Sequence, residues 1–159
     1  MKPATVAQIK KELTYRSPDE ITALCLRLAR FKKENKELLT YLLFESENEA
    51  GYVTQAKEHI AQGFKEINHS RWYYIKKSVR KILRETKKMI RYSPVKETEV
   101  ALLLYFCEEL RDFRPSIKKN TTLRNLYERQ LTLAEKKMDG LHEDLQFDYQ
   151  KEIEELKNL

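Results

Sequence analysis

The sequence predicts an all-α protein of about eight amphipathic helices. Apolar residues recur at spacings of three and four along most of the chain, and strict alternation of apolar and polar residues is nearly absent. Only three glycines and four prolines occur in 159 residues, too few for the closely spaced turns of an all-β domain. We expect either a short α-solenoid of helical hairpins, as in HEAT and armadillo proteins, or a compact helical bundle.

Start signals and apolar faces mark the first three helices. Thr5 precedes the segment VAQIKKEL. Ser17-Pro18-Asp19-Glu20 combines a cap residue, a proline at the first helical position and two early carboxylates. A third helix is expected from about Asn35. The residues expected to face inward are Ile21, Leu24, Leu28 and Phe31 in the second helix and Leu38, Leu39, Leu42 and Leu43 in the third.

A polar break separates the fourth and fifth helices. We expect the fourth over residues 49–67, after which Asn68-His69-Ser70 interrupts the helical pattern. The fifth covers residues 71–92. It should end at Ser93-Pro94, because the residue before a proline disfavours helical backbone.

Three further helices complete the chain. The sixth is expected over residues 96–113 and is stopped by Arg114-Pro115, and Asn120-Thr121-Thr122 caps the seventh. Asp139-Gly140 marks a break before the last helix. The apolar residues at helical spacing in that last segment are Leu141, Leu145, Tyr149, Ile153 and Leu156.

We interpret residues 1–159 as a single all-α domain with a hint of internal duplication, residues 1–68 against 69–159. The segments YRSPDEITALCLRLARF and RYSPVKETEVALLLYFCEELRDF share an aromatic and a basic residue, then Ser-Pro, acids and an apolar helix. The alternative is chance, because Ser-Pro is a common helix start.

The composition indicates a cytoplasmic protein without a membrane anchor. The N-terminal segment has no continuous apolar stretch typical of a signal peptide, and the longest apolar run, VALLLYF, is too short to span a bilayer. Cys25 and Cys107 each lie within an apolar run, so we expect two reduced, buried thiols.

The excess positive charge is confined to one segment. Residues 71–96 contain ten basic residues and one acid, Glu85, a net charge of +9. The whole chain carries +6, so everything outside the segment carries −3. A helix that needed only solubility would intersperse acids with bases, as the rest of this chain does.

On a helical wheel the basic residues form one stripe. With about 100° per residue, the eight basic residues from Lys76 to Arg91 occupy an arc of about 140°, separate from the apolar arc. The candidate polyanion-binding residues are Arg71, Lys76, Lys77, Arg80, Lys81, Arg84, Lys87, Lys88 and Arg91. Tyr73, Tyr74 and Tyr92 flank them and are candidates for stacking on bases.

Three hypotheses account for this stripe. Its lysines and arginines can bind nucleic-acid phosphates, which is the first candidate, or an acidic protein surface. Alternatively, the chain neutralises the stripe itself, since residues 135–159 hold eight acids against four bases. Binding to a membrane surface is disfavoured because the apolar arc, headed by Trp72, is expected to lie in the core.

Enzymatic motifs are absent, so we expect a non-catalytic binding or scaffolding module with no cofactor. No Gly-rich phosphate loop, Gly-x-Ser-x-Gly, Cys-x-x-Cys or His-Glu-x-x-His occurs. Two weak Glu/Asp-x-x-His pairs, Glu66 with His69 and Asp139 with His142, leave a di-metal carboxylate bundle as a remote alternative. The sparsely apolar last helix is a candidate edge for a homodimer.

Overall fold

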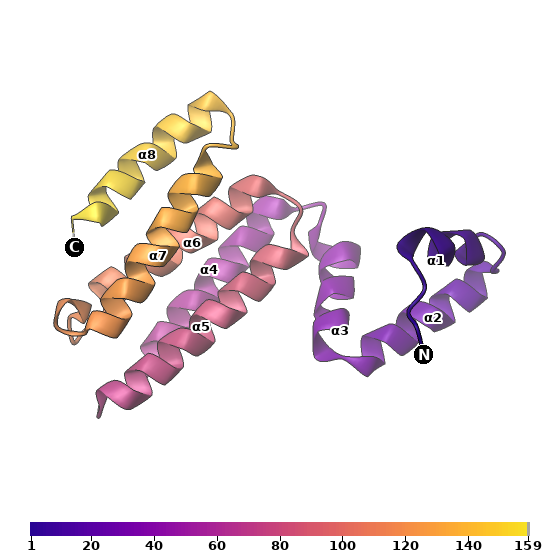
Figure 1. The fold of residues 1–159 in the computed structure, drawn as a ribbon, viewed down its shortest axis with the longest axis horizontal. Coiled ribbons are helices and arrows are strands. Elements are labelled where there is room, and N and C mark those ends of the chain that lie inside the picture. Colours follow the sequence, from indigo (N-terminus) through magenta and orange to yellow (C-terminus); the bar gives the residue numbers. More distant parts are fainter. Residues whose placement is uncertain (159) are drawn as a thin grey trace. The chain divides into compact units, whose positions relative to one another are not determined.

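The computed structural model describes residues 1–158, which form eight α-helices and no β-strand. The prediction of an all-α protein is therefore confirmed. In chain order the helices (Figure 1) are α1 (Val6–Leu13), α2 (Pro18–Phe31), α3 (Lys33–Thr40), α4 (Glu49–Lys65), α5 (Trp72–Tyr92), α6 (Lys96–Asp112), α7 (Thr121–Met138) and α8 (Glu143–Lys157). A π-helical turn, η1 (Tyr41–Glu45), follows α3, and a 3₁₀ turn, η2 (Ile117–Lys119), precedes α7.

The helix starts lie where the cap residues predicted them. The Ser17 backbone N–H donates to the Glu20 carboxylate at 2.7 Å, and the Glu20 N–H donates back to the Ser17 hydroxyl at 3.2 Å. This is a capping box, and the backbone donor at Ser17 lowers the pKa of Glu20. Asn120 caps α7 with a single hydrogen bond, in which its side-chain oxygen accepts from the Leu123 N–H at 3.1 Å.

The chain divides into two compact units, residues 1–44 and the part that begins at Glu45. The boundary considered for an internal duplication, between residues 68 and 69, falls inside the second unit, between α4 and α5, which pack against each other. The duplication stays a prediction.

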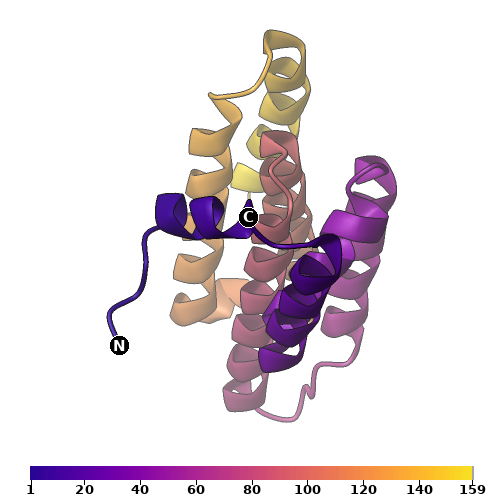
Figure 2. The same cartoon turned by 90° about the vertical axis from the view of Figure 1, so that its right-hand side faces the viewer.

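In the second unit, α6 is the central helix. It packs against α4, α5, α7 and α8, and both views show these helices side by side along a common direction (Figures 1 and 2). Nine residues of α6 are buried, as expected for a helix that is covered on several sides. The apolar run noted in the sequence, residues 100–106, belongs to this helix.

Side-chain hydrogen bonds tie the outer helices to their neighbours. The Tyr127 hydroxyl on α7 donates to the Leu156 carbonyl of α8 at 2.5 Å. The Tyr52 hydroxyl on α4 donates to the Met89 carbonyl of α5 at 2.8 Å. These bonds join α5 to α4 and α8 to α7.

The first unit has almost no core of its own. Within residues 1–44 only Tyr41 is buried. Of the residues expected to face inward in the second and third helices, Leu39 is half-buried and the other seven are exposed, so for these seven the expectation is wrong. The spacing of apolar residues identifies which side chains share a face, but it does not supply the surface that covers them. The exposed large apolar side chains here are Val6, Ile9, Leu13, Tyr15, Ile21, Leu24, Leu26, Leu28, Phe31, Leu38, Leu42, Leu43 and Phe44, besides Met1.

The two cysteines lie in different environments. Cys107 is buried in the core of the second unit, where burial raises the pKa of its thiol to about 12. Cys25 is only half-buried, and the two thiols are not joined in a disulfide. None of the helices in the described part combines the length and apolar character that crossing a lipid bilayer requires.

Candidate polyanion interface

Helix α5 presents one face to the core and the opposite face to solvent. Ile75, Val79, Ile82 and Thr86 are buried against the neighbouring helices α4 and α6. These four residues are spaced by three and four, so the helix leaves its other side free. That free side carries the basic stripe.

Most of the predicted basic residues are exposed. Lys76 and Lys88 are half-buried. The exposed ones are Arg71, Lys77, Arg80, Lys81, Arg84, Lys87 and Arg91. Within residues 1–158, six of these seven form no ion pair, the exception being Lys81, whose Nζ lies 3.9 Å from a carboxylate oxygen of Glu85.

The single acid of α5 lies at the edge of the stripe. Glu85 also approaches His59 of α4, with 3.1 Å between the carboxylate oxygen and Nε2. It is therefore turned toward the α4 side of the helix. The row of side chains formed by Lys77, Arg80, Arg84, Lys87 and Arg91 is consequently not interrupted by a negative charge.

The acidic last helix packs elsewhere. Helix α8 lies against α6 and α7, where the Tyr149 hydroxyl donates to Glu97 at 3.0 Å and Lys157 Nζ lies 2.6 Å from Glu135. Helix α5 packs instead on α4 and α6. The positions of α5 and α8 thus do not favour the hypothesis that the chain neutralises its own stripe with its C-terminal acids.

Two of the three candidate stacking residues are accessible. The exposed fractions of Tyr73 and Tyr74 are 65% and 41%, and their rings meet edge to face with 5.4 Å between centroids. Tyr73 projects in the same angular sector as Arg84 and Arg91, at the N-terminal end of the stripe. Tyr92, at the other end, is half-buried.

A groove between α5 and α7 extends the stripe sideways. Its volume is about 370 Å³, and Arg80 contributes from α5 while Arg129 contributes from α7. Both are exposed, and Arg129 also forms no ion pair within residues 1–158. The other lining residues are Leu83, Thr121, Thr122, Asn125, Leu126 and Gln130. The pattern of α5 alone could not reveal Arg129, because no local signal links it to the stripe.

The side-chain oxygen of Gln130, which lines the groove, is buried and lacks a hydrogen-bond partner among the described residues. Gln130 is 6% exposed, and its Nε2 donates to the Leu126 carbonyl at 3.4 Å. Its Oε1 accepts no hydrogen bond from any residue in the part that the structure describes. Such a group costs free energy, on the order of 1–3 kcal/mol, unless something donates to it.

The residues considered for a metal site do not come together. Glu66 accepts a hydrogen bond from Gln62 at 2.7 Å, and the His69 ring stacks on Phe113 at 4.9 Å between centroids. Residues 1–158 contain no group of three or more His, Cys, Asp or Glu side chains that could hold a metal ion. The di-metal alternative therefore lacks a ligand set among these residues.

Comparisons with models of protein families, with curated proteins and with solved structures found no match to this chain.

Proposed function

We propose that this protein is a non-catalytic module that binds nucleic acid through its backbone phosphates, using the basic stripe of α5. The observation that carries the proposal is the uninterrupted row of exposed, unpaired lysines and arginines on that helix. When unpaired lysines and arginines neutralise phosphates, the counterions condensed on the nucleic acid are released into solution. This release supplies affinity that does not depend on the base sequence.

The dimensions of the stripe suit a nucleic-acid strand. From Lys77 to Arg91 a helix rises about 21 Å at 1.5 Å per residue. One strand of a duplex places about six phosphates along that length, at 3.4 Å each. Arg80 and Arg129 add a second basic wall across the groove between α5 and α7.

The exposed tyrosines favour unpaired strands as the form bound. Tyr73 heads the stripe and offers a ring face on which a base can stack, whereas bases in a duplex are already stacked on one another. We therefore expect single strands to bind more tightly than duplexes of the same length.

An acidic protein surface is the second candidate. Exposed arginines beside exposed tyrosines are also the residues enriched in protein–protein interfaces. This alternative predicts that the same residues matter but that free nucleic acid does not compete with the partner.

The test is fluorescence anisotropy with labelled single-stranded and double-stranded nucleic acid across a range of salt concentrations. Affinity should fall as salt rises, with a log-log slope of about −0.7 to −0.9 for each phosphate contacted. Changing Arg80, Arg84 and Lys87 together to Glu should abolish binding, because these side chains are exposed and their replacement leaves the core intact.

A matched control separates the stripe from net charge. The variant with Lys65, Lys136 and Lys151 changed to Glu carries the same reduction in charge on exposed positions of other helices. It should keep most of the affinity. Absence of binding by the unaltered protein at low salt, or equal loss in both variants, would overturn the proposal.

A further inference from the structure

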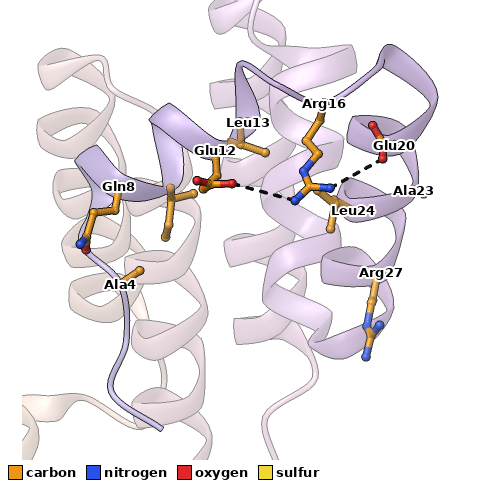
Figure 3. A pocket seen from close by; sticks show the side chains of 10 residues that line it. Ala4, Gln8, Glu12, Leu13, Arg16, Glu20, Ala23, Leu24 and Arg27 are labelled. Atoms are coloured by element: carbon orange, nitrogen blue, oxygen red, sulfur yellow. Dashed lines mark ion pairs between the residues drawn. The ribbon is translucent and has the colours of Figure 1, made fainter.

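The groove between α5 and α7 holds polar groups without partners, unlike a groove within the first unit. That other groove, of about 580 Å³ between α1 and α2, contains Arg16, which lies 4.0 Å from Glu12 and 3.7 Å from Glu20 (Figure 3). Its arginine is therefore already paired. In the groove between α5 and α7, neither Arg80 nor Arg129 forms an ion pair within residues 1–158. These unpaired cations remain available to an anionic ligand.

The groove between α5 and α7 has an apolar floor and a polar rim. Leu83 and Leu126 are half-buried, and Gln130 is buried one turn beyond Leu126. The exposed residues of the lining are Arg80, Thr121, Thr122, Asn125 and Arg129. The volume of about 370 Å³ lies within the range of roughly 300–1,000 Å³ that small-molecule sites occupy. An apolar floor beside cations suits one nucleotide, whose base has an apolar face and whose phosphate is anionic.

The helical geometry of α7 places Gln130 at the boundary between this groove and the core. Successive residues of a helix are about 100° apart, so Gln130 projects away from Arg129 and toward the face of Leu123 and Tyr127. Both of these residues are buried in the core of the second unit. A glutamine thus stands at a position where the core pattern of α7 would favour an apolar side chain.

The amide of Gln130 is poorly satisfied in the free protein. Its Oε1 accepts no hydrogen bond from any residue among those described, and its Nε2 reaches the Leu126 carbonyl at 3.4 Å, longer than the usual length of about 2.9–3.0 Å. Because so weak a bond holds it, the amide can turn toward the groove at little cost. A buried polar atom without a partner calls for an explanation, and a donor carried by a ligand supplies one.

We infer that this groove takes one unpaired nucleotide, with its phosphate on Arg80 and Arg129 and an N–H of its base donating to Gln130 Oε1. The inference rests on the proposed function, since the nucleotide belongs to the strand that lies along α5. Each of the common bases carries an N–H on its pairing edge, and in a duplex that edge is occupied by the partner base. The groove therefore selects unpaired strands without reading their sequence.

The test compares two labelled single strands of about ten nucleotides by fluorescence anisotropy, one of thymidine and one of N3-methylthymidine. The methyl group removes the N–H of the pairing edge and keeps the phosphates and sugars. The unaltered protein should bind the thymidine strand about five-fold more tightly, the effect of one hydrogen bond. Gln130→Leu should bind the two strands equally. The control Gln62→Leu, at an exposed glutamine of α4, should keep the preference.

The salt dependence of binding separates the role of Gln130 from a collapse of the groove. Gln130→Leu should leave the slope of log affinity against log salt unchanged, because the glutamine contacts no phosphate. A changed slope would show that the substitution displaced Arg80 or Arg129, and would overturn the role of Gln130. Equal affinity of the unaltered protein for both strands would overturn the inference and leave the proposed function standing. Failure to bind either strand at low salt would overturn both.

Discussion

Arg80 on α5 and Arg129 on α7 line the same groove, and neither forms an ion pair within residues 1–158. Two unpaired guanidinium groups on facing helices can contact one phosphate strand from both sides. The groove therefore connects the stripe of α5 with a helix that carries no such stripe.

Changing Arg129 to Ala should weaken binding to single-stranded nucleic acid and reduce the slope of log affinity against log salt by about 0.7, the contribution of one phosphate contact. Anisotropy titrations at several salt concentrations measure both quantities. Arg124→Ala is the control, because Arg124 lies on the same helix but is paired with Glu128 at 3.9 Å. An unchanged slope in Arg129→Ala would exclude the groove from the binding surface.

Replacing Gln130 by Leu should raise the free energy of unfolding by about 1 kcal/mol. The substitution removes a buried oxygen that has no partner among the described residues and keeps a similar volume. Urea denaturation measures the change. Gln130→Ala serves as the comparison and should lower stability, since it leaves a cavity. If Gln130→Leu were also destabilising, the oxygen must have a donor such as an ordered water.

Changing Tyr127 to Phe should lower the free energy of unfolding by about 1–3 kcal/mol, because the Leu156 carbonyl loses its donor in a buried setting. Burial raises the pKa of the Tyr127 hydroxyl above its ordinary value, so the group is protonated and able to donate near neutral pH. The matched control is Tyr15→Phe, at an exposed position, which should change stability by less than about 0.5 kcal/mol. Equal effects would show that the bond between α7 and α8 contributes little.

Changing Glu152 to Gln should stabilise the protein at pH 7 and have a smaller effect at acidic pH. Burial raises the pKa of Glu152, aided by Glu108 and Glu155 and opposed by Lys57. The folded state therefore binds a proton on the Glu152 carboxyl more tightly than the unfolded state does. The wild type consequently loses stability as the pH rises from the pKa of this carboxyl in the unfolded state through its higher pKa in the folded state.

Melting temperatures measured from pH 3 to pH 8 test this dependence on Glu152. The difference between Glu152→Gln and wild type should grow across the range in which the carboxyl ionises and then level off. Asp148→Asn, at an exposed position of α8, should show no comparable gain. A constant difference at all pH values would contradict the proposed role of burial.

The order and approximate limits of the helices follow from the sequence because they depend on near neighbours. Ser17 and Glu20 cap α2 within one turn, and Asn120 caps α7 in the same way. The third helix begins at Lys33 and not near Asn35, whose side-chain amide instead donates to the Leu28 carbonyl of α2 at 2.8 Å. Signals of this local kind place elements within a few residues.

The basic stripe was also readable from the sequence, since Arg80, Arg84 and Arg91 share a helical face through a fixed angle per residue. Only the tertiary structure decided what lies beside and over each face. It brought Arg129 to the stripe, placed α8 on α6 and α7, and left Leu28 and Phe31 exposed on α2. The physical reason is that periodicity is a property of a single helix, whereas burial and charge pairing depend on segments far apart in the chain.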